Sequence, residues 1–324
     1  MLIDSFGRNI DYLRLSITDR CNLSCLYCSP KEIQWQRKGE ILSYEEMVIL
    51  IDIVASMGVT RIRLTGGEPL LRRDFVPFVE QIKMLGKSLD LSMTTNGILL
   101  SGFAEGLLRA GMKRINISLD TLDEEKYERI TGSKAHSRVL DGIETALRLG
   151  FDSLKVNVVL VKGLNDDEID SFVHMAESKP LTVRFIEFMP AGLANWDRNR
   201  LVPSERILQG LRKRYGHVEQ VATDGGGPAL DYRLPGMVGR VGFISSVTEP
   251  SCATCNRLRV TAEGKLRPCL FSEIEFDIKT ALRASNVEDE VRMVILEALR
   301  AKPKGHFHLD SYEQTGRPMA QIGG

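Results

Sequence analysis

The residues of this 324-residue chain that are best suited to chemistry are its six cysteines, which fall into two separate triads. Their positions are Cys21, Cys25 and Cys28 in the first triad and Cys252, Cys255 and Cys269 in the second. Cysteine thiolates are the usual ligands of iron–sulfur clusters. Three thiolates can hold three irons of a [4Fe–4S] cluster and leave the fourth iron open to an external ligand. We therefore predict two such clusters, each with one open iron.

A zinc ion is the alternative occupant of each triad. Structural zinc sites take four ligands, often including histidine, and no histidine stands beside either triad in the sequence. The pair Cys252 and Cys255 alone would also suit a zinc half-site or a redox-active pair. Because Cys269 adds a third thiol, we place a three-cysteine cluster ahead of zinc and of a surface dithiol.

The balance of charge limits the classes of partner. The chain carries 43 Lys and Arg against 43 Asp and Glu, so no overall field attracts nucleic acid or an anionic membrane. The first residues lack the apolar core of a signal peptide, and the most apolar stretch, residues 47–57, is too short to span a bilayer. We therefore expect a cytoplasmic protein with no membrane or nucleic-acid partner, in a reducing compartment that favours metal ligation over disulfides.

Up to about residue 190, short apolar stretches typical of strands alternate with amphipathic helical patterns. Ser43 and Glu46 form a capping box that predicts the start of a helix, and Asn165 with Glu168 resembles a second one. This alternation predicts a parallel sheet with helices outside it. The six expected strands cover residues 12–18, 60–65, 90–95, 113–120, 154–161 and 181–189.

The expected strands share an unusual alternation. Parallel strands are usually apolar on both faces, whereas here Arg14 stands between Leu13 and Leu15, and Arg63 follows Ile62. Because side chains alternate faces along a strand, the apolar set must meet the helices and the polar set must line the concave face. A closed eight-stranded barrel would be filled by branched apolar side chains. We therefore predict an α/β fold with an incomplete (β/α)6 TIM-like barrel whose wet interior holds a ligand.

The polar face of these strands is rich in cations. Burying such charges without partners would cost several kcal/mol each, so anions should occupy the cavity. For any single cation, pairing with an acid such as Glu187 is an alternative. The five residues are Arg14, Arg61, Arg63, Lys155 and Arg184.

After residue 190 the pattern changes, and we divide the chain into a barrel domain, 1–190, and a smaller α+β domain, 191–324. We expect the second domain to carry the second triad and to lie over the open side of the barrel, ending in a flexible Gly323–Gly324 tail. Asn286 is a predicted helix N-cap. The elements expected after the turn-rich DGGGP segment at 224–228 are strands at 240–247, 257–260 and 265–270 and helices near 278–284 and 287–302.

Two arginines follow the CxxC pair of the second triad directly. At a spacing of two on a strand, Arg257 and Arg259 share one face. Their guanidinium groups could reach a phosphate or a reacting ring beside the cluster. An exposed basic strand is the alternative interpretation.

The first triad and the segment after the second expected strand together resemble the radical S-adenosylmethionine (SAM) superfamily. That family places CxxxCxxC after its first strand and a GGEP motif, here Gly66-Gly67-Glu68-Pro69, against the methionyl group of SAM. Tyr27 matches an aromatic residue near the adenine, and paired glycines permit close backbone approach to a ligand. The resemblance implies that the first cluster binds SAM and reduces it to a 5′-deoxyadenosyl radical, with the chemistry supplied by the cofactor.

Further segments narrow the resemblance to a family of radical SAM enzymes that cyclise GTP in the first step of molybdenum-cofactor biosynthesis. It rests on CATCNRLR with Cys269, YLRLSITDRCN, RFIEFM and the terminal QIGG. It implies that the open iron of the second cluster binds guanine and that the adenosyl radical removes the C3′ hydrogen. The C3′ radical then attacks C8. It also implies a flavodoxin- or ferredoxin-type electron donor and a downstream cyclic pyranopterin monophosphate synthase, and it leaves a homodimer open.

The same resemblance assigns roles to individual positions. Arg14, Arg257 and Arg259 are the implied catalytic residues, and the Gly323–Gly324 tail resembles one that reaches the active site. Leu23, Ser24 and Ser29 depart from the usual Phe, Arg and Met, which predicts altered cluster packing or potential rather than lost function. The implied SAM contacts are Tyr27, Gly66, Gly67, Glu68, Ser118 and Met189. The implied GTP contacts are Arg14, Arg61, Arg63, Thr94, Lys155, Arg184, Arg257, Leu258 and Arg259.

Three other functions stay open. A peptide-modifying radical SAM enzyme with an auxiliary cluster would share the barrel but usually has more C-terminal cysteines. An iron–sulfur electron carrier would need neither the GGEP motif nor a polar barrel interior. A zinc-stabilised GTP-binding module would have to hold GTP with scattered cations, because the chain has no P-loop motif.

Overall fold

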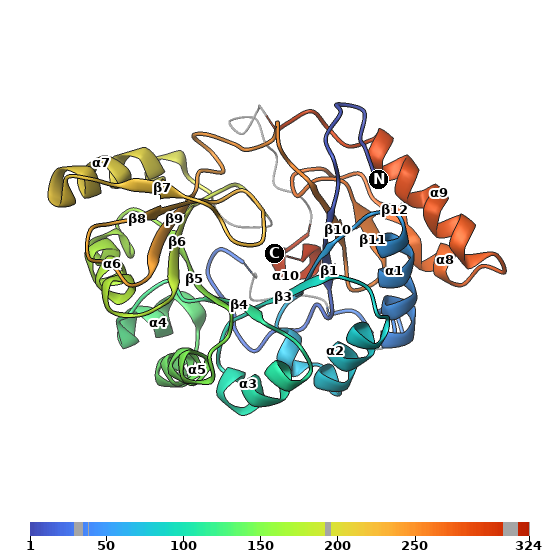
Figure 1. Cartoon of the computed structure of the whole chain (residues 1–324), viewed down its shortest axis with the longest axis horizontal. Helices are drawn as coiled ribbons and strands as arrows, with labels where there is room; N and C mark the ends of the chain where they lie inside the picture. Colours follow the sequence, from blue (N-terminus) through green and yellow to red (C-terminus); the bar gives the residue numbers. More distant parts are fainter. Residues whose placement is uncertain (29–34, 38, 192–195, 307–316, 324) are drawn as a thin grey trace.

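A curved sheet of six parallel strands, covered outside by helices, forms the first part of the molecule (Figure 1). The computed structural model describes residues 1–28, 35–37, 39–191, 196–306 and 317–323. The strands are β1 (Tyr12–Ser16), β2 (Arg61–Thr65), β3 (Asp90–Thr95), β4 (Arg114–Ser118), β5 (Ser153–Leu160) and β6 (Thr182–Glu187). The helices are α1 (Tyr44–Ser56), α2 (Phe75–Met84), α3 (Leu100–Arg109), α4 (Glu124–Thr131), α5 (His136–Leu149) and α6 (Ile169–Ser178).

The later part of the chain adds further elements around this barrel. They are α7 (Ser204–Tyr215), β7 (Glu219–Val221), β8 (Leu230–Arg233), β9 (Arg240–Ile244), β10 (Arg257–Val260), β11 (Lys265–Arg267), β12 (Phe276–Asp277), α8 (Ile278–Leu282), α9 (Val287–Arg300) and α10 (Met319–Ile322). In Figure 1, α10 and the C-terminus lie on the concave side of the sheet. No described helix is long and apolar enough to cross a membrane.

The twelve strands of the described residues belong to one sheet with the order β12-β11-β10-β1-β2-β3-β4-β5-β6-β9-β8-β7. β10 pairs parallel with β1, and β9 pairs parallel with β6. The outermost strands, β12 and β7, stand at opposite ends of this order, so the incomplete barrel that the sequence predicted is confirmed. The extension of both edges of this sheet by residues after 190 was not predicted from the sequence, and neither were β7, β8 and β12. A division into two domains at residue 190 stays a prediction.

The alternation of side chains explains how the sheet packs. Leu13, Leu15 and Ile62 are at most 2% exposed and belong to the hydrophobic core between sheet and helices. Arg14 and Arg63, which directly follow Leu13 and Ile62 along their strands, line the cavity on the other face. The predicted two-faced sheet is therefore confirmed.

One of the two predicted capping boxes is confirmed. Ser43 Oγ accepts the N–H of Glu46, whose carboxylate accepts the N–H of Ser43, and α1 begins there. Asn165 makes no cap hydrogen bond, so the second prediction is wrong. Its amide instead donates to the carbonyls of Asp120, just after β4, and of Val159 in β5, so the side chain joins the ends of these two strands. α9 begins directly after Asn286, although that side chain makes no cap bond.

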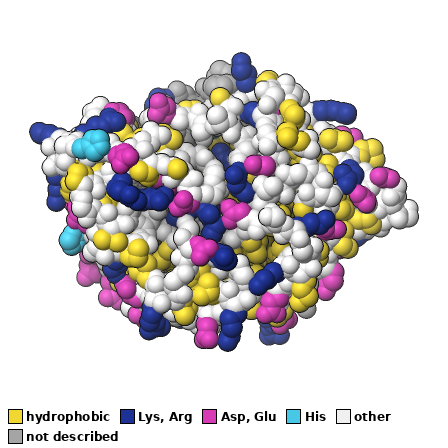
Figure 2. Space-filling view, in the orientation of Figure 1, with side chains coloured by type: hydrophobic (Ala, Val, Ile, Leu, Met, Phe, Trp, Pro, Cys, Tyr) yellow, Lys and Arg dark blue, Asp and Glu magenta, His cyan; other side chains and the backbone are white. Residues whose placement is uncertain are grey.

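Acidic and basic side chains are interspersed over the face of the molecule seen in Figure 2. This mixture agrees with the formal net charge of zero. Binding of an anionic ligand therefore depends on local groups of cations.

Candidate active site

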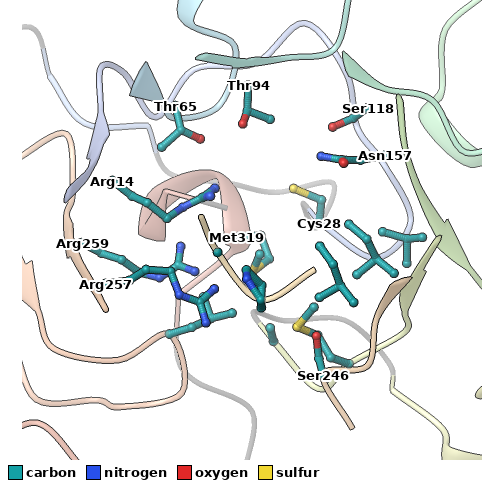
Figure 3. A pocket seen from close by; sticks show the side chains of 18 of the residues that line it. Arg14, Cys28, Thr65, Thr94, Ser118, Asn157, Ser246, Arg257, Arg259 and Met319 are labelled. Atoms are coloured by element: carbon teal, nitrogen blue, oxygen red, sulfur yellow. The ribbon is translucent and has the colours of Figure 1, made fainter. Parts of the chain in front are cut away.

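Both cysteine triads line a single cavity of about 360 Å³ on the concave side of the sheet. All six cysteines are free thiols. In Figure 3, Arg14, Arg257 and Arg259 extend from one wall of this cavity, and Ser118 and Asn157 lie across from them. The topology therefore brings together chemistry-bearing residues that are far apart in the sequence.

Most of the predicted site residues line this cavity. Besides the cysteines they are Arg14, Tyr27, Arg63, Gly66, Gly67, Thr94, Ser118, Arg184, Met189, Arg257 and Arg259. The predicted residues that are not part of the cavity lining among the described residues are Arg61, Glu68, Lys155 and Leu258. Leu258 faces the hydrophobic core, opposite to its two arginine neighbours on β10.

The first triad lies on a loop that follows β1 and is anchored to the end of α4. The N–H groups of Ser24 and Leu26 donate to the carbonyls of Thr131 and Ile130, both at 2.9 Å. Burial raises the pKa of Cys21 to about 12 and that of Cys25 well above its usual value. These thiols are therefore protonated in the metal-free chain, and a metal that binds them must displace protons.

Two of the residues that depart from the family pattern lie in this loop. Leu23 is buried in the hydrophobic core, 8% exposed, and Ser24 contributes the backbone bond to Thr131. An effect of these departures on packing or potential stays a prediction, and Ser29 lies outside the described residues.

The glycine pair after β2 leaves no room for side chains. A Cβ on Gly66 would lie 2.2 Å from the carbonyl oxygen of Thr18, and one on Gly67 would lie 2.2 Å from that of Arg20. The backbone of this motif therefore runs directly against the segment that leads into Cys21. Either glycine could be replaced only by moving the two segments apart.

Glu68 does not face the cavity, although the family resemblance implied a ligand contact for its motif. Its buried carboxylate accepts hydrogen bonds from Thr95 Oγ1 at 2.8 Å, Asn96 N at 2.7 Å and Leu70 N at 3.0 Å. Burial raises the pKa of Glu68 to about 7. The side chain therefore fixes the loop after β3 from behind the cavity wall.

A tyrosine–carboxylate pair stands beside the first triad. The hydroxyl of Tyr27 donates to Asp120 Oδ2, and Asp120 Oδ1 accepts the N–H of Val159 at 2.8 Å. Burial raises the pKa of Asp120 to about 6. Asp120 was not among the predicted site residues, although it lies on the polar face at the end of the expected strand 113–120, which could have indicated it. The pair fixes the ring of Tyr27 at the cavity wall.

The second triad is assembled from three segments around β10. Arg8 Nη1 donates to the carbonyl of Cys252 at 2.8 Å, and Lys302 Nζ donates to the carbonyls of Arg257 at 2.8 Å and Pro268 at 2.6 Å. Burial alone would raise the pKa of Cys255, but the charges of Arg257 and Lys302 bring it down to about 6. A thiolate therefore forms readily at this position.

A histidine lies against this triad, which the sequence did not reveal. His306 Nδ1 is 3.1 Å from Cys252 Sγ, and His306 Nε2 is 3.0 Å from the carbonyl oxygen of Ser246. No local pattern could have indicated this contact, since the two residues are far apart in the sequence. The observation that no histidine stands beside the second triad holds for the sequence and not for the fold.

Strand register sets a row of guanidinium groups across three neighbouring strands. Arg14 on β1 is paired with Arg259 on β10 and with Arg63 on β2. Burial and the neighbouring cations lower the pKa of Arg14 to about 10 and that of Arg259 well below its usual value. Like charges placed side by side on a sheet destabilise it. An anion bound in the cavity would relieve this repulsion.

The last described residue takes part in this row. The carbonyl of Gly323 accepts a hydrogen bond from Arg259 Nη1 at 2.7 Å and from Arg14 Nε at 3.4 Å. The N–H of Met319 donates to the carbonyl of Cys28 at 3.1 Å. The C-terminal segment thus contacts both the first triad and the arginines, and Gly324 lies outside the described residues.

Two of the five cations are neutralised by acids that were not predicted from the sequence. Arg61 pairs with Asp11 at 2.9 Å, and Arg184 pairs with Asp231 at 2.9 Å. Glu187, the acid suggested from the sequence, instead accepts backbone N–H groups from residues 204, 247 and 248. The prediction that anions bound in the cavity balance the charges of all five cations is therefore wrong for Arg61 and Arg184, whose charges are balanced by aspartates of the chain itself.

Removing the partner of Arg184 should destabilise the fold. Asp231→Ala is expected to lower the free energy of unfolding by about 3–5 kcal/mol, because a buried guanidinium would lose its carboxylate. Both side chains are at most 5% exposed. Denaturant unfolding of the metal-free chain measures this change.

The matched control is Asp152→Ala, which removes an ion pair with Lys113 whose two side chains are 65% and 60% exposed. That substitution should change the free energy of unfolding by less than about 1 kcal/mol. Equal small losses in the two variants would contradict the account of Arg184 and Asp231.

Lys155 and Thr94 carry polar atoms that a ligand could use. Lys155 Nζ donates to Ser153 Oγ at 2.8 Å and to the carbonyl of Asp224 at 3.2 Å. Burial and the charges of nearby arginines lower the pKa of Lys155 to about 7. Thr94 Oγ1 is buried and has no hydrogen-bond partner within the described part of the chain. Such an orphaned polar atom beside a cavity indicates a ligand contact.

Two family models match the chain: the Radical SAM superfamily over residues 15–176, and Molybdenum Cofactor Synthesis C over residues 181–308. The chain is 45% identical over 323 residues to the GTP 3′,8-cyclase of Thermodesulfovibrio yellowstonii, covering 99% of each chain. It is 43% identical over 326 residues to the GTP 3′,8-cyclase of Desulforamulus reducens, covering 100% of each.

Solved structures agree with the fold. Streptococcus suis SuiB bound to its precursor peptide SuiA is similar with a TM-score of 0.63 and 13% identity, covering 97% of this chain and 76% of that one. Methylornithine synthase, PylB, is similar with a TM-score of 0.50 and 21% identity, covering 64% and 63%. At these identities the likeness concerns the fold alone. The full-length relatives and the two family models show that the chain belongs to the GTP 3′,8-cyclase family of radical SAM enzymes.

Proposed function

We propose that this chain cyclises GTP to (8S)-3′,8-cyclo-7,8-dihydroguanosine 5′-triphosphate, the first step of molybdenum-cofactor biosynthesis. The observation that carries the proposal is one cavity that joins both cysteine triads and a row of arginines between them. The name of the full-length relatives supports the same substrate.

The residues of the first triad fit a cluster and SAM. Cys21, Cys25 and Cys28 would hold a [4Fe–4S] cluster, with SAM beside it. When bound, this pair supplies the 5′-deoxyadenosyl radical that removes the C3′ hydrogen of GTP. Glycines in close contact with the backbone and the fixed ring of Tyr27 support this placement. The implied SAM contacts among the cavity-lining residues are Tyr27, Gly66, Gly67, Ser118 and Met189.

The second triad would hold a second [4Fe–4S] cluster, and the iron that no cysteine ligates would bind the guanine of GTP. Three thiols, one of them with its pKa lowered to about 6, support this assignment. Arg14, Arg257 and Arg259 would orient the nucleotide and stabilise negative charge on it while C3′ approaches C8. We further propose a flavodoxin- or ferredoxin-type electron donor and transfer of the product to cyclic pyranopterin monophosphate synthase.

The affinity for GTP should fall as the pH rises above about 7. Lys155 lies outside the cavity lining but within the field of Arg63 and Arg184, which line it, and with a pKa of about 7 it is charged below that pH and neutral above it. Only the charged ammonium attracts phosphate, so GTP binding raises its pKa and takes up a proton. By linkage, affinity is highest below pH 7 and falls by at most about tenfold per pH unit above it. Equilibrium binding of GTP between pH 6.5 and 9 measures the slope.

Lys155→Arg provides the control, because an arginine stays charged over this whole range. The slope should flatten in that variant. An equal slope in both proteins would remove Lys155 from the account.

The proposed function is tested by reconstituting the protein without oxygen, counting iron and adding SAM, GTP and a reductant. The proposal predicts about eight irons per chain, cyclised product, and 5′-deoxyadenosine that depends on GTP. Iron for one cluster only, or bound zinc, would contradict the second cluster. Deoxyadenosine formed equally well without GTP would contradict the substrate.

A further inference from the structure

Tyr12 begins β1 and lies two places before Arg14, on the same face of the strand. Because side chains alternate faces along a strand, the phenol ring and the guanidinium group both point into the cavity that they line. Tyr12 is only 3% exposed. It was not among the predicted site residues, because an aromatic residue is common in any strand.

The neighbouring strands fix Tyr12 among cations. Its Cα is paired with that of Arg257 on β10 and with that of Arg61 on β2. Its N–H donates to the carbonyl of Asn256 at 3.2 Å. The guanidinium carbon of Arg63 lies 5.5 Å from the centre of the Tyr12 ring, and the negative face of an aromatic ring attracts a cation at this distance. The ring therefore helps to fix the direction of Arg63.

The hydroxyl of Tyr12 lies among groups that only donate hydrogen bonds. Burial alone would raise the pKa of Tyr12, but the charges of nearby arginines lower it. Those arginines are Arg63, Arg14, Arg257 and Arg259. An arginine side chain carries five N–H donors and no acceptor, so none of the four can take the hydrogen of the phenol.

A hydroxyl can accept and donate at the same time. The oxygen of Tyr12 accepts a hydrogen bond from Arg14. The O–H hydrogen of Tyr12 therefore needs a different partner, and that partner must be an acceptor. Near several positive charges, an acceptor that carries negative charge makes stronger hydrogen bonds than a neutral one.

A phosphate oxygen of a nucleotide meets both conditions. It accepts hydrogen bonds, and its charge offsets the repulsion among the arginines. The carbonyl of Gly323, which already accepts from Arg259 and Arg14, carries no net charge. The alternative is that Tyr12 only separates the guanidinium groups, a role that needs its ring but not its hydroxyl.

We propose that Tyr12 is a substrate-binding residue, whose hydroxyl accepts an N–H of Arg14 and donates its own hydrogen to a phosphate oxygen of GTP. The inference rests on the proposed function, because it requires a nucleoside triphosphate in this cavity. It adds a neutral donor to a binding site otherwise described by its cations.

The test is equilibrium binding of GTP and of guanosine to the reconstituted protein, without SAM or reductant. Tyr12→Phe keeps the ring and removes only the hydroxyl. It should weaken the binding of GTP by about tenfold or more, the usual effect of losing a hydrogen bond to a charged group. Guanosine, which has no phosphate, should bind equally to both proteins. The iron content of the same samples should be unchanged.

Tyr12→Leu removes the ring as well as the hydroxyl. It should weaken GTP binding more than Tyr12→Phe does, because Arg63 also loses the aromatic face on which it lies. Comparison of the two variants therefore separates the effect of the hydroxyl from that of the ring.

Tyr44→Phe is the matched control. Tyr44 also carries a cation, with Arg72 4.1 Å from its ring centre, and its hydroxyl donates to the carbonyl of Arg73 at 3.1 Å. It lies on α1, outside the cavity lining. The affinities of this variant for GTP and guanosine should equal those of the unchanged protein.

Equal GTP affinity in Tyr12→Phe and the unchanged protein would overturn the inference, and so would an equal loss for GTP and guanosine. If Tyr12→Phe lost iron, GTP binding to the two metal-free chains decides, because the hydroxyl and the phosphates interact without a cluster. If the unchanged protein bound GTP no more tightly than guanosine, the proposed substrate would be wrong instead. The two failures are therefore distinguishable.

Discussion

Cys25→Ser is expected to abolish cleavage of SAM, with 5′-deoxyadenosine formation falling by more than about a thousandfold, because the cofactor carries this chemistry. Cys25 lies in the middle of the first triad and lines the cavity. Iron content should fall from about eight to about four per chain. Mass spectrometry of the nucleoside products and an iron assay measure the two effects.

Cys252→Ser is the complementary variant. It should remove the other half of the iron and abolish the cyclised product, yet leave the first cluster in place, since the first triad sits on a separate loop anchored to α4. If Cys25→Ser still produced deoxyadenosine, the assignment of the first triad would be wrong. If both variants lost all iron, the two sites would not be independent.

Arg257→Ala should leave both clusters intact and lower the yield of cyclised product by at least about a hundredfold, the usual effect of removing a group that stabilises charge in a reaction. Arg257 lines the cavity and stands on the same face of β10 as Arg259. Deoxyadenosine should still form, uncoupled from cyclisation. Product quantification against iron content measures the effect.

A second readout for this variant does not depend on turnover. The charge of Arg257 is one cause of the lowered pKa of Cys255, so the alanine variant should raise that pKa in the metal-free chain. Arg257→Lys keeps a charge but loses the planar fork and should be intermediate in both measurements. Arg138→Ala, on the exposed face of α5, is the control without effect. Unchanged turnover in Arg257→Ala would remove this residue from the mechanism.

The barrel could be predicted from the sequence because the residue pattern that specifies each strand is local. Each strand repeats the same alternation, so that Leu13 and Leu15 face the helices while Arg14 faces the cavity. Alternation along a strand has a period of two, and it is fixed once the strand forms. The cysteine spacing of the first triad is local in the same way. The same rule predicted that Arg257 and Arg259 share one face of their strand.

Contacts between distant segments could not be predicted in this way. Asp231, which neutralises Arg184, lies on β8, and its pairing depends on β9 and β8 joining the edge of the barrel at β6. Glu187 has the right charge, but its carboxylate already accepts hydrogen bonds from backbone N–H groups. His306 reaches Cys252 only because the C-terminal segment folds back along the triad. No periodicity in the sequence reports such pairings.

The central claim is that this chain uses a radical to remove the C3′ hydrogen of GTP, and it is tested most directly with GTP carrying deuterium at C3′. After reconstitution and a single turnover with SAM and a reductant, the account predicts 5′-deoxyadenosine that is one mass unit heavier, together with cyclised product that has lost the label. Unlabelled deoxyadenosine from 3′-labelled GTP, in a reaction that still consumes GTP, would contradict it.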